Sequence, residues 1–186
     1  MRKILKNRKA LSTVVTTLII LVVSVLLAGV VTYFAINVTS TRVQEESLNI
    51  MYAHLWYNTP TTGTGQAEAA MEIVNTGGRD VVLQKIAVRG QTVQAVTANA
   101  VYYDTLTTPL TTDLLYISAG GFSAYTNETA GTTLVLKSGY SVVIYITSPD
   151  SISVNDVGLT VAISVFSSQA TYYKETNVQA SNAATN

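Results

Sequence analysis

The sequence predicts an α+β fold, with one long N-terminal hydrophobic α-helix followed by an antiparallel β-sandwich. Three observations support this fold class. No charged residue occurs from Ala10 to Thr41, directly after a strongly basic N-terminus. Apolar residues then recur at helical spacing up to about Asn58. From Gln66 onward, short runs of Val, Ile, Thr and Tyr alternate with Gly, Asn, Asp and Pro.

The charges are unevenly distributed, so the formal net charge of 0 is misleading. Five of the 11 Lys and Arg residues precede residue 11, and the rest of the chain carries 6 basic against 11 acidic residues. This remainder has no basic patch, so nucleic acid is not expected as a partner. The chain has no cysteine, which excludes a disulfide framework and a thiolate metal site.

The first predicted element is a hydrophobic segment of about 28 residues, from Leu11 to Val38. A secretory signal has an apolar run of about 7–15 residues followed by a small-residue cleavage site, and this segment has neither feature. It exceeds the roughly 20 residues that a transmembrane helix needs. We therefore expect a membrane anchor whose basic end lies in the cytoplasm, with the rest of the chain outside.

The helical pattern continues beyond this segment. Leu48, Met51, Tyr52, Leu55 and Trp56 follow the spacing of an amphipathic helix, and no proline interrupts residues 11–58. We therefore expect one helix over residues 11–58, about 70 Å long. Its C-terminal half should pack on a domain.

Small and hydroxyl-bearing side chains line one face of the apolar half. At about 100° per residue they fall within one sector of the helix. Such a face lets helices approach closely in an apolar medium. It is either a helix-packing face or a consequence of a Thr-rich composition. Its members are Thr13, Thr17, Ser24, Ala28, Thr32, Ala35 and Thr39.

Residues 59–65, with Pro60 and two glycines, are expected to link the helix to a head domain over residues 66–186. In the first head segment Ala67, Ala69, Met71 and Ile73 alternate with residues of the opposite face, which carries Glu68 and Glu72. Strand-like segments at roughly ten-residue spacing are typical of an immunoglobulin-like antiparallel sandwich. The others are 81–90, 134–136, 140–148, 158–167 and 170–176.

No arrangement of residues predicts catalysis, so we expect a protein that is not an enzyme and needs no cofactor or metal. The only histidine, His54, is placed on the predicted helix as a partly exposed residue without metal-ligating partners. The segment 148–156 contains Asp150 and Asp156 and is either an ion-binding loop or a solvated turn. Lone glycine clusters without a strand-loop-helix context do not support nucleotide binding.

The N-terminal segment "RKALSTVVTTLIILVVS" resembles that of archaeal type IV pilin precursors, which are related to archaellins. The head segments "EIVNTGGRDVVLQKIAVRG" and "VGLTVAISVFSSQATYYKETNVQA" resemble the same family. The resemblance implies that a prepilin peptidase cuts between Ala10 and Leu11, which removes residues 1–10 as a leader and keeps the helix. Val15 stands at the fifth mature position, where bacterial pilins have Glu. The absence of an acid in 13–17 and Ala10 in place of glycine favour an adhesion pilin over an archaellin.

The resemblance implies the major structural subunit of an extracellular adhesion pilus, a helical homopolymer assembled through the N-terminal helix. The precursor would lie in the cytoplasmic membrane with its N-terminus inside, and its partners would be the peptidase, an assembly ATPase and a membrane platform protein. Asn127 and Asn37 begin N-x-[ST] sequons and are candidate glycosylation sites. The alternatives are an archaellin and a monomeric, membrane-anchored surface binding protein.

Overall fold

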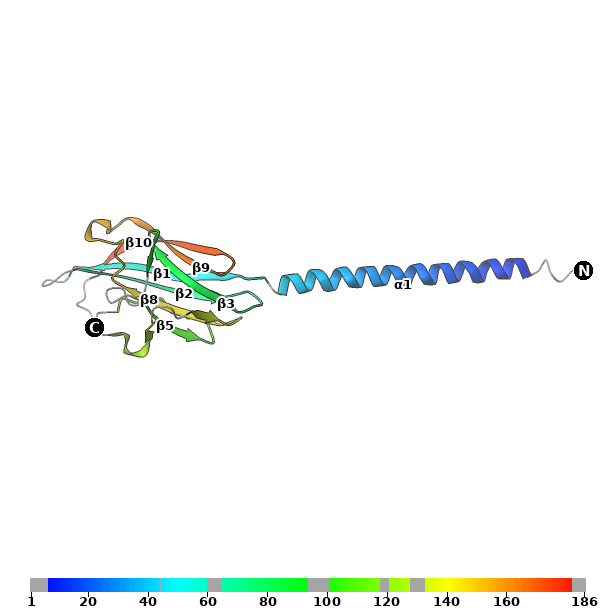
Figure 1. The fold of residues 1–186 in the computed structure, drawn as a ribbon, viewed down its shortest axis with the longest axis horizontal. Helices are drawn as coiled ribbons and strands as arrows, with labels where there is room; N and C mark the ends of the chain where they lie inside the picture. Colours follow the sequence, from blue (N-terminus) through cyan, green and yellow to red (C-terminus); the bar gives the residue numbers. More distant parts are fainter. Residues whose placement is uncertain are drawn as a thin grey trace, which may run out of the picture. The chain divides into compact units, whose positions relative to one another are not determined.

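The computed structural model describes residues 7–43, 45–59, 65–93, 101–117, 121–127 and 133–181. These residues belong to two compact units, Met1–Val43 and Gln44–Asn186. The first contains a single helix, and the second, the head, contains all of the strands (Figure 1). The predicted combination of one long apolar helix and a β-rich head is therefore confirmed at this level.

Helix α1 spans Asn7–Val43 and has 37 residues, which corresponds to about 55 Å. It is rich in Val, Ile and Thr, whose β-branched side chains are mediocre helix formers in water. An apolar medium changes this preference, because a helix satisfies all of its interior backbone hydrogen bonds within one segment. The composition of α1 therefore suits a helix that lies in apolar surroundings.

The expected continuation of this helix to Asn58 is wrong, because residues Leu48–Asn58 form strand β1. A β-bulge explains the misleading pattern. Two residues of β1, Tyr52 and Ala53, stand opposite one residue of β2 (Gln66–Asn75), and Tyr52 has a positive φ of 46°. The bulge shifts the alternation by one residue, and β1 has apolar residues on both faces: Leu48 and Leu55 on one, Tyr52 and Trp56 on the other. Together these residues mimic the spacing of a helix.

Residues 59–65 do not link the helix to the head either. They join β1 to β2, which pair in antiparallel register from Leu48↔Asn75 to Asn58↔Gln66. Residues 60–64 lie outside the described part of the chain. The head consequently begins at Gln44 and not at residue 66.

The remaining strands belong with β1 and β2 to one sheet. Its order is β4-β3-β9-β10-β1-β2-β8-β5-β6, and β7 pairs with β3. Every pairing is antiparallel except that of β1 with β10. The strands are β3 (Val81–Val88), β4 (Gln91–Val93), β5 (Val101–Leu106), β6 (Thr126–Asn127), β7 (Leu134–Leu136), β8 (Ser141–Thr147), β9 (Thr160–Ser167) and β10 (Thr171–Ser181), with 3-10 turns η1 (Gly121–Ala124) and η2 (Val154–Asp156).

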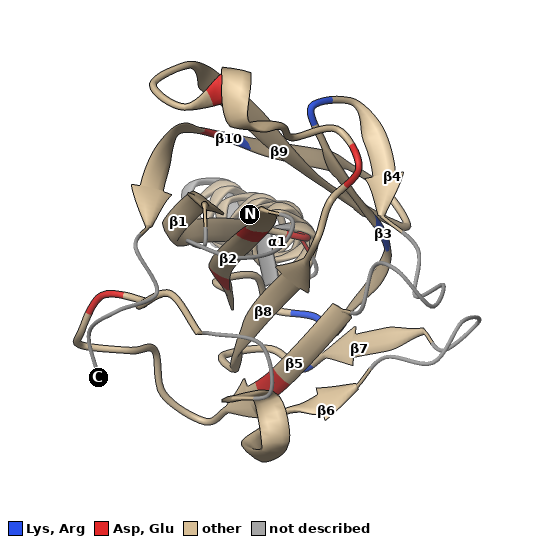
Figure 2. Ribbon diagram, turned by 90° about the vertical axis from the view of Figure 1, so that its left-hand side faces the viewer, with Lys and Arg blue, Asp and Glu red and all other residues tan. Residues whose placement is uncertain are grey.

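This sheet curls into a half-barrel and does not form the expected two-sheet sandwich (Figure 2). Strand β10 is the reason. Its residues 171–177 pair with β9, while Val178–Ser181 pair with Leu55–Asn58 of β1. One strand thus joins two groups of strands that would otherwise be separate sheets.

The main core fills the inside of the curl and draws on both halves of the sheet. Ile73, Ile144, Ile163 and Val165 are fully buried there. A second, smaller core lies on the outer face of β1, β2, β8 and β5, where residues 107–117 cross the sheet. We call residues 107–117 the strap. With η1 and its neighbours it covers Trp56, Ala70, Val143 and Tyr145.

The turn after β2 holds the incoming chain against the sheet. The N–H groups of Thr76 and Gly77 both donate to the carbonyl oxygen of Ser47, at 2.9 and 3.1 Å. A Cβ atom at Gly77 would lie 2.6 Å from the carbonyl oxygen of Glu45, so this approach requires glycine. The buried Asn75 amide donates to the carbonyl oxygens of Arg79 (2.8 Å) and Leu136 (3.1 Å) and accepts from Gly77 N–H.

Replacing Asn75 by Ala should destabilise the head by about 2–3 kcal/mol, because it leaves buried backbone groups without partners. We expect the melting temperature to fall by about 5–10 °C, as followed by far-UV circular dichroism. The matched control is Asn49→Ala on the exposed side of β1, which should change stability by less than about 0.5 kcal/mol. Equal melting temperatures for the two variants would contradict the structural role of Asn75.

Candidate functional site

Helix α1 exposes a continuous apolar surface. The segment Leu11–Thr41 has 31 residues with a mean hydropathy of 2.9 in its most apolar part, and none of that part is buried. Its large side chains are roughly half to two-thirds exposed along the whole segment. Soluble proteins rarely leave so large an apolar patch in water. This helix is long and apolar enough to be a membrane anchor or a signal sequence.

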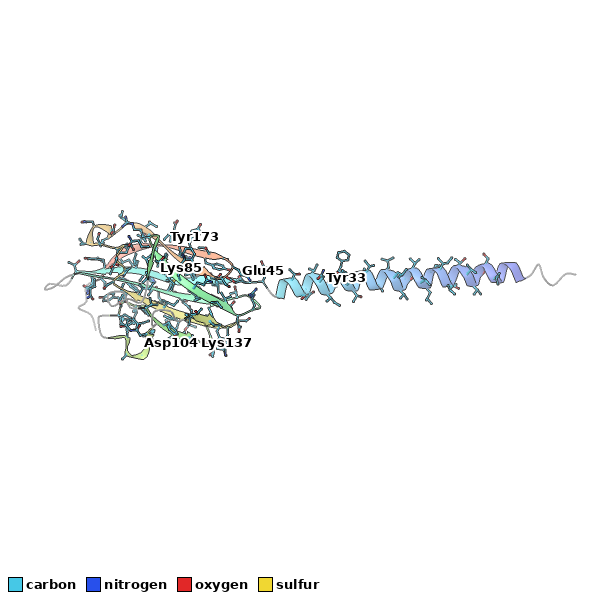
Figure 3. The ribbon with its side chains drawn as sticks, in the orientation of Figure 1. Tyr33, Glu45, Lys85, Asp104, Lys137 and Tyr173 are labelled. Carbon is cyan, nitrogen blue, oxygen red and sulfur yellow. The ribbon has the colours of Figure 1, made fainter. Side chains whose placement is uncertain are left out.

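The apolar segment is longer than a membrane requires. Its 31 residues correspond to about 46 Å, whereas the hydrocarbon core of a bilayer is about 30 Å thick. Twenty residues counted from Leu11 end at Val30, and Tyr33 and Phe34 follow closely with their rings in edge-to-face contact. Tyr33 projects outward from the helix (Figure 3). Tyrosine is enriched at membrane interfaces, so in a membrane the last third of α1 would extend beyond the hydrocarbon.

The predicted helix-packing residues do fall on one face of α1, since the whole segment is helical. Three of their hydroxyl groups bond within the helix itself. Thr17 donates to the carbonyl oxygen of Val14 (2.9 Å), Ser24 to that of Ile20 (2.7 Å) and Thr32 to that of Ala28 (2.7 Å). These hydroxyl groups therefore need no polar partner from outside. The face combines small size with satisfied polarity, which suits close contact with another apolar surface.

The other predicted sites are distributed over both units. The Ala10–Leu11 bond lies in the first turns of α1, which begins at Asn7. Asn37 is an exposed residue of α1. Asn127 is an exposed residue of β6, paired with Tyr102 of β5, and the Thr129 that completes its sequon lies outside the described residues.

His54 lies on strand β1 and not on a helix. Its Nε2 atom is 2.7 Å from Oδ1 of Asp113 in the strap, and its ring stacks on Trp56 with centroids 5.1 Å apart. This arrangement attaches the strap to the sheet. Among the described residues no group of three or more His, Cys, Asp or Glu side chains could hold a metal ion.

In the candidate ion-binding loop, residues 148–156, Asp156 forms an ion pair with Arg89. Asp156 accepts a hydrogen bond from Arg89 Nη1 at 2.6 Å and others from the backbone and hydroxyl group of Ser153. These hydrogen bonds, with those from Ser153 the larger contribution, lower the pKa of Asp156. Arg89 and Asp156 line a shallow polar depression together with Asp150. The guanidinium group of Arg89 disfavours the binding of a metal cation here. The loop is better explained as a turn held by its own hydrogen bonds.

Two buried glutamates of β2 were not predicted. Glu68 Oε1 accepts the backbone N–H of Ile117 at 2.9 Å, and Glu72 Oε1 accepts that of Leu110 at 2.8 Å. Both face away from the main core as predicted, but the strap covers them, and they are only 3% and 0% exposed. The sequence signal was weak, because their face of β2 also carries Gln66, and only Ala70 and Val74 on it are apolar.

Burial raises the pKa of Glu68 to about 8, against the opposing effect of the Ile117 N–H. Burial also raises the pKa of Tyr145, whose hydroxyl group donates to the carbonyl oxygen of Leu115 in the strap. On the outer face of this half of the sheet, polar side chains within an apolar cluster therefore hold the strap by hydrogen bonds.

Comparison with protein-family models and with curated proteins finds no match for this chain.

The division into two units predicts that the head can be separated from α1. A chain that starts at Gln44 should be soluble without detergent and should keep the far-UV circular dichroism of a β-rich fold, because the main core is built from head residues alone. The full chain should partition into the detergent phase. Aggregation of the shortened chain in an unfolded form would contradict this division.

Proposed function

We propose that this protein is the major structural subunit of an extracellular filament of the archaeal type IV pilus kind, in which α1 polymerises with copies of itself. The observation that carries the proposal is the unburied apolar surface of α1. It is too extensive for water, longer than a bilayer requires, and interrupted along one face by small side chains with internally bonded hydroxyl groups. A bundle of such helices would cover the surface on every side.

The basic leader would prevent the helix from leaving the membrane. Each Lys or Arg costs roughly 2.5–3.5 kcal/mol at the centre of a membrane helix, so five of them hold the N-terminus on the cytoplasmic side. A prepilin peptidase cutting between Ala10 and Leu11 would remove all five at once. The helix would then be free to leave the bilayer.

Transfer from membrane to filament exchanges one apolar environment for another, so burial alone gives little preference between the two. Close packing along the face that includes Ser24, Ala28 and Thr32 would supply that preference. Extraction would still require work, which assigns a role to an assembly ATPase and a membrane platform protein. The heads would form the outer layer, where adhesion to cells or solids would take place, and Asn127 would be the better placed glycan acceptor.

The N-terminal peptide tests this proposal most directly. Material sheared from the cell surface and pelleted as filaments should yield a peptide that begins at Leu11 in mass spectrometry. An intact leader on a detergent-extracted monomer would overturn the proposal in favour of a membrane-anchored surface binding protein. Loss of swimming with attachment retained, after the gene is disrupted, would instead indicate an archaellin.

A pair of substitutions tests the packing face. Ala28→Phe places a large ring on the small-residue face and should abolish filaments, because helices could no longer approach closely there. Leu26→Phe makes a smaller change on the opposite face and should largely preserve them. Filaments in sheared material would be counted by electron microscopy. As a control, the amount of each variant in the membrane should equal that of the wild-type protein. Equal filament yields from the two variants would contradict a special role for this face.

A further inference from the structure

Polar side chains beneath the strap attach it to the sheet, in addition to the apolar contacts of Leu114 and its neighbours. Glu72 and Glu68 accept the backbone N–H groups of Leu110 and Ile117 near its two ends. Between these points, Tyr145 donates its hydroxyl group to the carbonyl oxygen of Leu115 at 3.1 Å. Asn58 and His54 add contacts to strap side chains, to Tyr116 at 3.1 Å and to Asp113 at 2.7 Å.

This attachment is not fully satisfied. Among the described residues, the buried Oε2 atom of Glu72 and the buried Oδ1 atom of Asn58 have no hydrogen-bond partner. Each such atom costs free energy that hydration would return if the strap moved away. Leu115, near the C-terminal end of the strap, is 70% exposed, and Leu114 is the only strap residue among the buried members of the small core beneath. The strap therefore has the features of a segment that opens before the rest of the domain.

The surroundings of Glu68 provide no positive charge to stabilise a carboxylate. Strands β1, β2, β8 and β5, the strap and η1 contain no Lys or Arg. The acidic side chains on this face are Glu72, Asp104 and Asp113. The other titratable groups facing this cluster are His54 and Tyr52 of β1, Tyr102 of β5, Tyr145 of β8, Tyr125 beside η1 and Tyr116 of the strap.

We propose that the strap is a pH-controlled cover: it stays closed while the Glu68 carboxyl group is neutral and opens progressively as that group ionises. Opening lifts residues 107–117 from the sheet and hydrates Glu68 and Glu72. It also uncovers an aromatic surface on the outer face of the sheet, formed by Trp56, Tyr145 and their neighbours. This inference concerns the head alone and does not depend on polymerisation.

The direction of the effect follows from linkage. The pKa of Glu68 is about 8 with the strap closed and returns toward 4.5 when opening exposes the group to water. The open form therefore binds fewer protons, and a rise in pH favours it. The opening equilibrium constant should rise about tenfold per pH unit between about 4.5 and 8 and level off above 8. The total change is about 3,000-fold.

Hydrogen exchange on the full chain in detergent micelles tests the proposal. After correction for intrinsic exchange rates, peptides covering the strap should show this rise in opening constant between pH 5 and 8. At pH 9 they should exchange at least about a hundredfold faster than peptides from β9, because the strap opens without global unfolding. Trp56, the only tryptophan, should become more accessible to acrylamide over the same range.

Glu68→Gln keeps the shape and the acceptor oxygen but cannot ionise, so the tenfold rise in opening constant per pH unit should be lost. The matched control is Glu175→Gln on the exposed side of β10, which removes the same charge and should behave as wild type. A pH-independent opening constant in the wild type would overturn the proposal. Equal protection of the strap and β9, or an unchanged pH dependence in Glu68→Gln, would do so as well.

Discussion

The short parallel pairing between β10 and β1 determines the architecture of the head. Val178–Ser181 of β10 lie beside Leu55–Asn58 of β1, while the earlier part of β10 belongs to β9. Two groups of strands thereby become one curled sheet around a single core. The pairing also places β1 in the interior of the sheet, with a neighbour along each side, immediately after the chain enters the head.

The two units meet opposite physical requirements. The head buries its apolar side chains and places even its carboxylates against backbone N–H groups. Helix α1 leaves its apolar side chains uncovered and turns its hydroxyl groups inward onto its own carbonyl oxygens. The head is therefore suited to water and the helix to an apolar environment. A filament with helices inside and heads outside would satisfy both requirements at once, as would a membrane anchor with an external head.

The sequence predicts those features that depend on local patterns. Residues 11–38 form one long, predominantly apolar run, and most strands alternate clearly, as in the residues that precede and follow the turn after Asn75. The bulge at Tyr52 and Ala53 defeats the same reasoning, because one extra residue changes the phase of the alternation. The β10–β1 pairing joins residues more than 120 positions apart and leaves no local signal. Glu68 and Glu72 look like solvent-facing residues until the strap, which is distant in sequence, is placed over them.

The position of β1 has a mechanical consequence. Tension between α1 and the head would enter the domain through residues 45–47, which the turn at Thr76 and Gly77 holds by two hydrogen bonds to Ser47. The load would then pass into β1, the next element of the chain. Strand β1 is held by β2 over its full length, through antiparallel hydrogen bonds perpendicular to the strand, and by the parallel pairing with β10 at its far end. Extracting β1 along its own direction would require its bonds with β2 to shear together rather than break one by one.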